Sequence, residues 1–155
     1  MATSLTRLNS IATVVLPIGN SRSICRESHS RTCGKLMQNL PDSTIRPWGY
    51  YRVLHTVGSS VKLKELTVEP GKSLSMQKHL HRSELWFVAE GIATLNTLKD
   101  SNVEHVADYG LYQYIIIESE DWHQLQNNQD FPLKIIEIQF GDKCIEEDII
   151  RQGVV

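Results

Sequence analysis

Short runs of β-branched and aromatic residues, separated by turn signals, fill the chain from Arg46 onward. The turns are marked by Glu69-Pro70-Gly71, Glu90-Gly91 and Gly141-Asp142, among others. This texture is typical of an all-β sandwich or barrel. The expected strands cover residues 61–68, 74–77, 84–89, 92–98, 103–107, 112–117, 122–126 and 133–140. Strands of this number, joined by short loops, predict one closed or nearly closed barrel.

Two segments depart from the strand pattern. Residues 144–151 place Ile145, Ile149 and Ile150 roughly on one face of a helix, which predicts a short C-terminal helix. Residues 1–40 show no clear helical or alternating apolar period, and they hold ten Ser and Thr residues and five basic residues against the single acid Glu27. We therefore expect a flexible head over residues 1–40 and one domain over residues 41–155.

The composition narrows the classes of partner. A chain of 155 residues with 41% hydrophobic residues is expected to form one compact domain. The formal charge of −2 and the isoelectric point near 6.3 argue against a nucleic-acid-binding protein. No apolar run approaches the ~18 residues that a membrane span needs. The predicted partner is a small molecule, with no nucleic acid and no membrane, and open sheet edges make a homodimer the expected assembly.

The cysteines indicate the compartment. Cys25, Cys33 and Cys144 form no C-x-x-C pair and are odd in number, so neither a zinc ribbon nor a disulfide framework is indicated. Free thiols are typical of a reducing compartment, and we expect a cytoplasmic protein. The alternative is a plastid or another organelle, because the Ser/Thr-rich and Arg-rich head resembles a transit peptide. A linker left from a longer ancestor would have a similar composition.

One stretch carries groups that could bind a metal. Three polar side chains lie two residues apart and share one face of an extended chain: Gln77, His79 and His81. Glu84 breaks this parity, so a bend near Arg82-Ser83 is needed to return its carboxylate to the same interior. Two imidazoles, a carboxylate and an amide oxygen suit a borderline divalent ion, zinc first, with iron, manganese, cobalt or nickel also admissible. His123 offers a further imidazole downstream, and the resemblance given next implies that the ligands are Gln77, His79, Glu84 and His123.

The spacing of these residues resembles the first motif of the cupin family. That motif reads G-x5-(H/Q)-x-H-x4-E-x6-G, and its positions hold Gly71, Gln77, His79, Glu84 and Gly91. The second cupin motif is matched more loosely, by His123 and Asn127. Several further runs resemble, in the right order, the mannose-6-phosphate isomerase type II domain, which also forms the C-terminal part of bifunctional mannose-1-phosphate guanylyltransferases. These runs are Arg46-Pro47-Trp48-Gly49, Lys62-Leu63-Lys64, His81-Arg82-Ser83-Glu84-Leu85-Trp86 and the acidic tail 146–151.

This resemblance implies a single jelly-roll barrel, or double-stranded β-helix, with one divalent metal. It also implies the isomerisation of mannose 6-phosphate to fructose 6-phosphate, in which a Lewis-acidic metal stabilises an enediol and a His or a carboxylate moves the proton. His81 and Arg82 are the candidate catalytic residues. Lys64, Arg82 and Arg151 are the candidates for gripping the phosphate. Ordinary surface roles are the alternative for His81 and for the three cations.

The chain departs from the family just before His123. Glu118 and Glu120 stand where relatives usually have a proline and a glycine, so the tight turn is expected to be altered. A non-catalytic cupin that binds a sugar or supports an assembly is therefore the alternative function. A cupin oxygenase is disfavoured by Gln77 in place of a histidine. Because only about 45 residues precede the barrel, we expect no guanylyltransferase activity.

Overall fold

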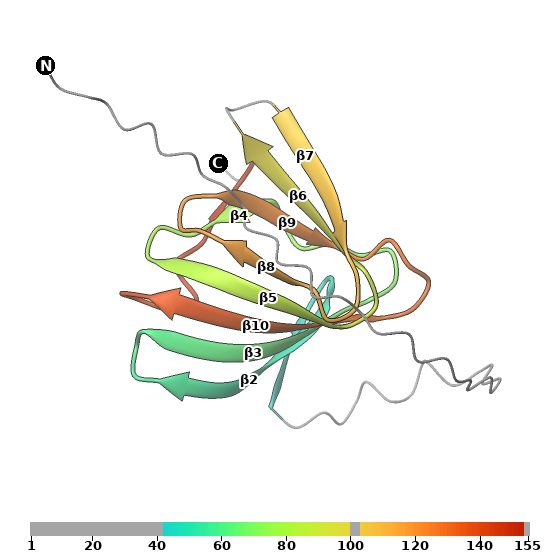
Figure 1. The fold of residues 1–155 in the computed structure, drawn as a ribbon. Helices are drawn as coiled ribbons and strands as arrows, with labels where there is room; N and C mark the ends of the chain where they lie inside the picture. Colours follow the sequence, from blue (N-terminus) through green and yellow to red (C-terminus); the bar gives the residue numbers. More distant parts are fainter. Residues whose placement is uncertain (1–41, 100–102, 154–155) are drawn as a thin grey trace, which may run out of the picture.

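The computed structural model describes residues 42–99 and 103–153, and Figure 1 shows them as strands joined by loops. Every regular element in these residues is a strand, which confirms the all-β prediction. The strands are β1 (Ser43–Arg46), β2 (Gly49–Val57), β3 (Val61–Val68), β4 (Gln77–Lys78), β5 (Arg82–Glu90), β6 (Ala93–Lys99), β7 (Val103–Tyr109), β8 (Tyr114–Ile117), β9 (Trp122–Gln126), β10 (Leu133–Gly141) and β11 (Ile150–Arg151).

The strands form two antiparallel sheets. The larger sheet has the order β1-β2-β3-β10-β5-β8, and the smaller has the order β11-β4-β9-β6-β7. β10 lies between β3 and β5, where Ile135 pairs with Leu66 on one side and with Val88 on the other. Segments far apart in the sequence therefore become neighbours, and the two sheets enclose one interior.

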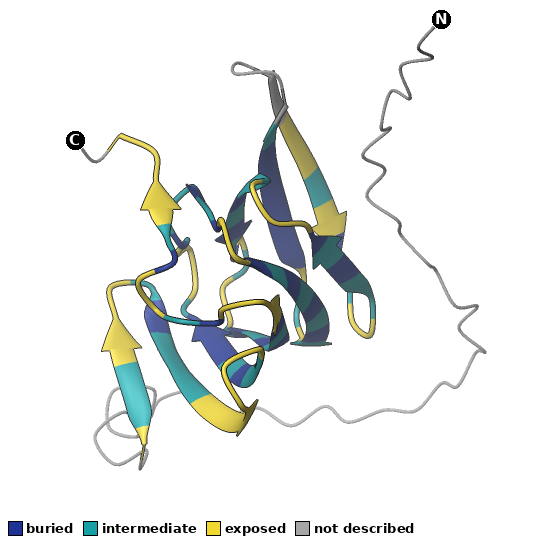
Figure 2. Cartoon of the chain, turned by 90° about the vertical axis from the view of Figure 1, so that its left-hand side faces the viewer, coloured by how far each residue is buried: buried dark blue, intermediate teal, exposed yellow. Residues whose placement is uncertain are grey.

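Alternation along the strands builds the core. In β5 and β10, successive residues are buried and partly exposed in turn, and Figure 2 shows this alternation as bands along the strands. Successive side chains of a strand point to opposite faces of its sheet, so one face of each strand lines the interior. Both sheets contribute apolar side chains to one core, which includes Leu66, Val68, Trp86, Val88, Leu95, Ile115, Leu125, Leu133 and Ile135.

Most predicted strands are present, and three were missed: β1, β2 and β11, the last in a segment predicted to be helical. β3 and β9 have the predicted bounds, and β10 ends one residue beyond its predicted end. The predicted strand at 74–77 is reduced to β4, because the chain before Gln77 makes only an isolated bridge from Ser73. β1 and β2 were not predicted. The second half of β2 is exposed on both faces, so it lacks the alternating apolar signal.

The predicted helix at 144–151 is wrong. These residues form turns and then β11, which pairs with β4. The carbonyl oxygens of Ile145 and Asp148 accept hydrogen bonds from the Arg82 guanidinium, and the Asp148 carboxylate accepts from the backbone N–H groups of Leu80 and His81. Groups that a helix would pair locally are thus engaged by distant parts of the chain, and so short a helix is marginal by itself.

The predicted head at 1–40 lies outside the described residues. Within residues 42–99 and 103–153, no helix is long and apolar enough to cross a membrane.

Candidate metal centre

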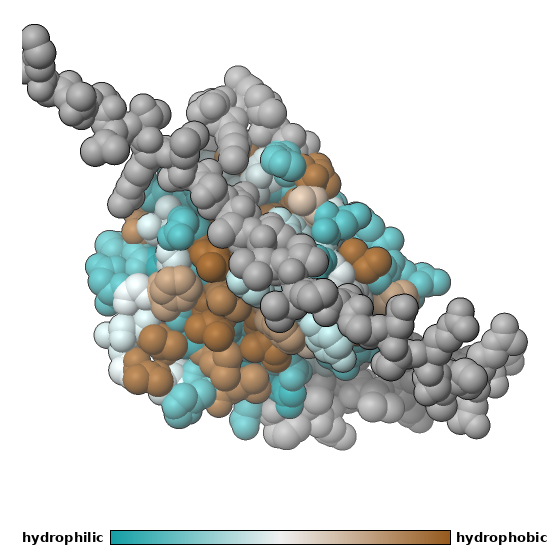
Figure 3. Space-filling view, viewed as in Figure 1, coloured by the Kyte–Doolittle hydropathy of each residue, from teal (hydrophilic) through white to brown (hydrophobic). Residues whose placement is uncertain are grey.

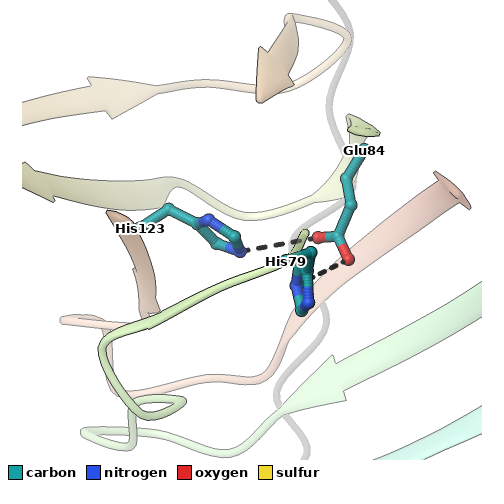
Figure 4. A group of neighbouring side chains, drawn as sticks. All are labelled: His79, Glu84 and His123. Atoms are coloured by element: carbon teal, nitrogen blue, oxygen red, sulfur yellow. Dashed lines mark ion pairs between the residues drawn. The ribbon is translucent and has the colours of Figure 1, made fainter. Parts of the chain in front are cut away.

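Three buried side chains from separate parts of the chain meet inside the barrel (Figure 4). His79 follows β4, Glu84 lies on β5 and His123 lies on β9. Their ligand atoms all lie within 4.8 Å of one another. His79 Nε2 is 3.1 Å from Glu84 Oε1, and His123 Nε2 is 3.7 Å from Glu84 Oε2. The structure thus brings together three of the four predicted ligands.

The hydrogen bonds of the two imidazoles fix which nitrogen faces the centre. His79 Nδ1 lies 2.5 Å from the carbonyl oxygen of Asp148, and His123 Nδ1 lies 2.9 Å from that of Asp121. A carbonyl oxygen only accepts, so each Nδ1 carries a proton and each Nε2 is the nitrogen that faces Glu84.

The centre has the donor set of a divalent metal site. His123 Nε2 is buried and has no hydrogen-bond partner among the described residues, which is rare for a buried polar atom. When both Nε2 atoms are unprotonated, they and the Glu84 carboxylate face one another, and a divalent ion between them would relieve their repulsion together with the Arg82 guanidinium, which reaches Glu84 Oε1 and His79 Nε2. Two nitrogens and one oxygen suit zinc and similar borderline ions.

Gln77, the fourth predicted ligand, lies directly across from His123. The two residues are partners in the β4–β9 pair, and Gln77 is buried. Its Oε1 accepts a hydrogen bond from the Ser75 hydroxyl at 3.0 Å. An amide oxygen has two lone pairs, so this bond leaves Gln77 able to serve as an oxygen ligand.

Arg82 inserts its guanidinium into the same cluster. Its Nε donates to Glu84 Oε1 at 3.1 Å, and its Nη2 lies 3.3 Å from His79 Nε2. Burial alone raises the pKa of Glu84, but the contacts with His79, His123 and Arg82 outweigh burial and hold that pKa well below its usual range. Burial lowers the pKa of His123. Glu84 is therefore a carboxylate and His123 a neutral imidazole at neutral pH, which are the forms that bind metals.

Sequence reasoning missed a second buried acid, Glu137. Trp86 Nε1 donates to Glu137 Oε1 at 3.2 Å and to Glu84 Oε2 at 3.1 Å, and Gln139 Nε2 donates to Glu137 Oε2 at 3.0 Å. Burial, and then the charge of Glu84, raise the pKa of Glu137 to about 8. A signal for it was present: in the strand predicted at 133–140, Glu137 has the same parity as Leu133 and Ile135 and so faces the interior.

His81 lies outside the cluster. The chain bends at Leu80 and His81, before the predicted bend at Arg82-Ser83. The His81 side chain is therefore exposed, and its Nδ1 lies 3.6 Å from Asp142 Oδ2. The predicted shared face of Gln77, His79 and His81 holds only for the first two.

The three predicted phosphate-binding cations have different surroundings. Lys64 is buried, with its Nζ 2.8 Å from Glu146 Oε1 and 4.6 Å from the centre of the Tyr51 ring. Arg82 is engaged with the cluster described above. Arg151 is exposed on β11, opposite Gln77. Of the three, Arg82 is the one whose side chain contacts His79 and Glu84.

The turn before His123 keeps a tight conformation without its glycine. Glu120 has φ 70°, in the left-handed region that favours glycine. Its backbone N–H donates to the His79 carbonyl oxygen at 2.7 Å. The turn therefore ties the segment before His123 to the segment that carries His79.

Comparison with known proteins gives consistent matches. A family model described as "Mannose-6-phosphate isomerase C-terminal" matches residues 34–153. The chain is 37% identical over 107 residues to a mannose-1-phosphate guanylyltransferase of Salmonella muenchen, and 42% identical over 106 residues to the alginate biosynthesis protein AlgA of Pseudomonas putida. These matches cover 69% and 68% of this chain but 21% of each relative. The chain thus spans about a fifth of their length.

Solved structures with the same fold have low sequence identity. The capsular polysaccharide assembling protein CapF of Staphylococcus aureus matches with a TM-score of 0.61 and 13% identity, over 72% of this chain and 32% of that one. The oxalate decarboxylase formate complex of Lactobacillus farciminis matches with a TM-score of 0.60 and 16% identity, over 71% of this chain and 33% of that one. At these identities the likeness shows the fold alone, which is the cupin barrel.

Proposed function

Because this chain belongs to the mannose-6-phosphate isomerase C-terminal family, we propose that it is a metal-dependent isomerase that interconverts mannose 6-phosphate and fructose 6-phosphate. The observation that carries the proposal is the buried cluster of His79, Glu84 and His123, with the unpaired Nε2 of His123. By their names, one relative given above is a guanylyltransferase for mannose 1-phosphate and the other takes part in alginate biosynthesis, which supports a mannose phosphate as substrate.

His79, Glu84 and His123 would hold the metal, with Gln77 as a further ligand, and zinc is the proposed ion. A bound divalent metal supplies Lewis-acid stabilisation of the negative charge that develops on the substrate oxygens during isomerisation. The carbonyl oxygens of Asp148 and Asp121 fix the two imidazoles in the orientation that this role requires.

Isomerisation also moves a proton between two adjacent carbons of the sugar. Burial and the charge of Glu84 raise the pKa of Glu137 to about 8, so a minor fraction of this carboxyl group is ionised at neutral pH. This carboxylate would take the proton from one carbon and, as the carboxylic acid, return it to the adjacent carbon. Trp86 and Gln139 orient that carboxyl group. We therefore assign the proton transfer to Glu137 rather than to His81, whose side chain is exposed.

The phosphate group needs a cation that can leave its present partner. Lys64 is buried and pairs with Glu146, a half-exposed carboxylate, so a bound phosphate would have to replace Glu146 as its anionic partner. Lys64 and Arg151 are the proposed phosphate contacts, with Arg82 as a third. An Arg82→Ala variant should raise the KM for the sugar phosphate more than Arg52→Ala, because Arg52 pairs with Glu65 on the outer face.

A coupled assay with mannose 6-phosphate tests the proposal. Metal-loaded protein should turn the substrate over, chelation should abolish the rate, and added divalent metal should restore it. Glu84→Gln should be inactive, whereas His105→Ala, a change at an exposed histidine of β7, should keep the rate. If fully metal-loaded protein turns over no hexose 6-phosphate, isomerase activity is wrong for this chain.

A non-catalytic cupin that binds a sugar or supports an assembly is the second candidate. The observation in its favour is that Lys64 and Arg82 are each engaged by protein groups, and that all three ligands are at most 2% exposed. Calorimetry with mannose 6-phosphate separates the candidates: binding without turnover supports the second.

We also propose a cytoplasmic location, in keeping with the free thiol of Cys144. The alternative is import into a plastid or another organelle through residues 1–40. Fusing these residues to a reporter in a plant or algal cell distinguishes the two: a diffuse cytosolic signal supports the proposal, and organelle import contradicts it.

A further inference from the structure

The segment after β10 contacts the candidate metal centre. This segment, residues 144–152, is called the strap below. The carbonyl oxygen of Asp148 accepts a hydrogen bond from the Arg82 guanidinium and lies against His79 Nδ1, and the carbonyl oxygen of Ile145 also accepts from Arg82. The three candidate ligands are at most 2% exposed. A sugar can therefore reach them only when part of the surrounding protein moves.

Polar contacts, rather than a sheet, hold most of the strap in place. Its strand β11 pairs with β4 over two residues, whereas β10 pairs with β3 over eight. The Asp148 carboxylate accepts from the backbone N–H groups of Leu80 and His81. Figure 3 shows hydrophilic and neutral surface near the left-hand ends of β5 and β10, where the chain leaves β10 for the strap, and apolar surface over the middle of both strands. The strap, all of which the structure describes, adds no residue to the apolar core, so it can open at a low cost in free energy.

One side chain, Glu146, ties the strap to the six-stranded sheet. Its Oε1 lies 2.9 Å from Lys62 Nζ and 2.8 Å from Lys64 Nζ, and its Oε2 accepts from the Tyr51 hydroxyl at 3.5 Å. Burial alone raises the pKa of Glu146, but the hydrogen bonds and charges of the two lysines outweigh burial and lower that pKa to about 2. The Glu146 side chain is 47% exposed. It is thus an anion held by three donors, at a place that anions in solution can reach.

The cations around Glu146 outnumber it. Arg46 joins Lys62 and Lys64, since its Nη2 lies 3.4 Å from the hydroxyl group that binds Glu146. Glu137 lies 4.0 Å from Lys64 Nζ, but it is largely protonated at neutral pH because burial and a neighbouring charge raise its pKa to about 8. A phosphate dianion has two negative charges and three acceptor oxygens. It therefore complements these three cations more fully than one carboxylate does.

We propose that Glu146 occupies an anion site from within the chain, and that an external phosphate group which replaces it on Lys62 and Lys64 releases the strap from the metal centre. Glu146 is two residues from Asp148, so the backbone that contacts Arg82 loosens when the Glu146 side chain leaves the lysines. An entering sugar phosphate thus opens its own path to the ligands. The inference deepens the proposed phosphate contact of Lys64 and in that respect rests on the proposed function, but release of the strap needs neither metal nor turnover.

Hydrogen exchange of the metal-free full chain, followed by NMR, tests the release. The amides of Leu80 and His81 donate to the Asp148 carboxylate, so their exchange rates report whether the strap is closed. Saturating inorganic phosphate should speed their exchange by about 10-fold relative to chloride at the same ionic strength. The amides of β3 and β10, which pair over eight residues, should keep their protection.

The matched pair of variants is Glu146→Gln and Glu147→Gln. Each removes one negative charge from neighbouring positions, but Glu147 is an exposed acid whereas Glu146 binds the two lysines. Calorimetry should show that Glu146→Gln binds inorganic phosphate about 10-fold more tightly than wild type, because the internal competitor is gone, and that Glu147→Gln binds as wild type does. Lys62→Gln should bind it at least about 10-fold more weakly. If Glu146→Gln does not fold, Lys62→Gln and the wild-type exchange rates still decide.

A comparison of ligands identifies the source of the phosphate group. Strap release at a lower concentration of mannose 6-phosphate than of inorganic phosphate supports the site with a sugar phosphate as its ligand, and release at equal concentrations supports it with free phosphate. Mannose itself should have no effect.

The proposal is overturned if inorganic phosphate at about 10 mM, beyond the range of specific binding, does not bind the wild-type chain. It is equally overturned if bound phosphate leaves the exchange of Leu80 and His81 unchanged, or if Glu147→Gln strengthens phosphate binding as much as Glu146→Gln. A chain that releases the strap but turns over no sugar phosphate contradicts the isomerase activity alone. An active isomerase whose strap ignores phosphate contradicts this inference alone.

Discussion

The two halves of the barrel interior differ, although the same strands line both. Along β5 the inward-facing residues run from charged to apolar, in the order Arg82, Glu84, Trp86 and Val88. Along β10, which runs antiparallel, they follow the matching order Gln139, Glu137, Ile135 and Leu133, read from its end. Trp86 lies at the boundary between the polar and the apolar half. Its ring is fully buried, and its Nε1 donates to the carboxyl groups of Glu84 and Glu137.

This contrast separates the source of stability from the source of chemistry. The apolar half removes large side chains from water, and burying each of them contributes about 1.5–3 kcal/mol to the free energy of unfolding. The polar half does the opposite: it buries a guanidinium, two carboxyl groups and two imidazoles, which costs free energy unless every group is paired. Nothing in the packing requires that cost, so we expect the polar half to be kept for its chemistry.

The largest effect should come from a cavity in the apolar half. Leu133→Ala removes a fully buried side chain from β10, and the free energy of unfolding should fall by about 2–5 kcal/mol. The metal content of the folded variant should stay at the wild-type level, because the ligands lie in the other half. Denaturant unfolding measures the first and metal analysis the second. Phe131→Ala, at a residue that is 47% exposed, is the matched control and should cost much less.

The next largest effect should come from removing one ligand in the polar half. His123→Ala should weaken divalent metal binding by about 100-fold or more, because the ion loses one donor of a small set. Metal titration followed by calorimetry measures the Kd. His105→Ala should bind as wild type does, since His105 is exposed on β7. Equal affinity in both variants would contradict the assignment of His123.

A smaller effect should follow from titrating Glu137 in the metal-free protein. Its folded pKa is raised from 4.5 to about 8, so its contribution to stability is complete below pH 4.5 and is lost as the pH rises through about 8. Glu137→Gln cannot ionise. Relative to wild type, this variant should therefore become more stable by about 2 kcal/mol between pH 6 and pH 8.

Urea unfolding at several pH values measures this difference. The matched control is Glu147→Gln, a change at an exposed acid, which should track the wild type at every pH. A constant difference between Glu137→Gln and wild type from pH 6 to pH 8 would show that the folded pKa of Glu137 does not lie in this range.

The smallest effect should lie outside both halves, in the turn before His123. Glu120 has φ 70°, so Glu120→Gly relieves the strain of a side chain in the left-handed region and should raise the free energy of unfolding by up to about 1 kcal/mol. Ser119→Gly is the control, because Ser119 has no positive φ and gains only freedom in the unfolded chain. A thermal shift of the same sign in both variants would argue against strain at Glu120.

How far the sequence predicts this molecule depends on whether the signal is local. β3 and β9 were predicted with their bounds, because β9 alternates over its full length and β3 is a run rich in apolar residues that ends at the turn Glu69-Pro70-Gly71. The ligands His79, Glu84 and His123 follow from spacing and from the family motif. His81 was wrongly predicted to share the inward face of Gln77 and His79, because the alternation of side chains along a strand does not show where the chain bends. The helix at 144–151 was wrong because the hydrogen bonds of Asp148 are made to residues that are distant in the sequence.

Two residues of the polar half were also hard to predict, for a different reason. Glu137 and Gln139 lie on a strand that was predicted correctly, with the parity that faces the interior. When one strand is considered alone, a polar residue at an inward position only breaks the expected pattern of apolar inward residues, and nothing identifies it as part of a site. They become part of a site only when β10 is placed beside β5, so that Gln139 faces Glu84 across the pair.

The position of β10 between β3 and β5 has a consequence for the time course of folding. β3 cannot pair with β10 until the chain has closed the long loop that separates Leu66 from Ile135. Loop closure of this kind costs entropy before any contact is gained, and domains dominated by such pairings fold in milliseconds to seconds rather than in microseconds. Until β10 pairs with them, β3 and β5 each have one edge with unpaired backbone groups. Association with other partly folded chains then competes with folding. Refolding yield should therefore fall as protein concentration rises, even where the folded protein is stable.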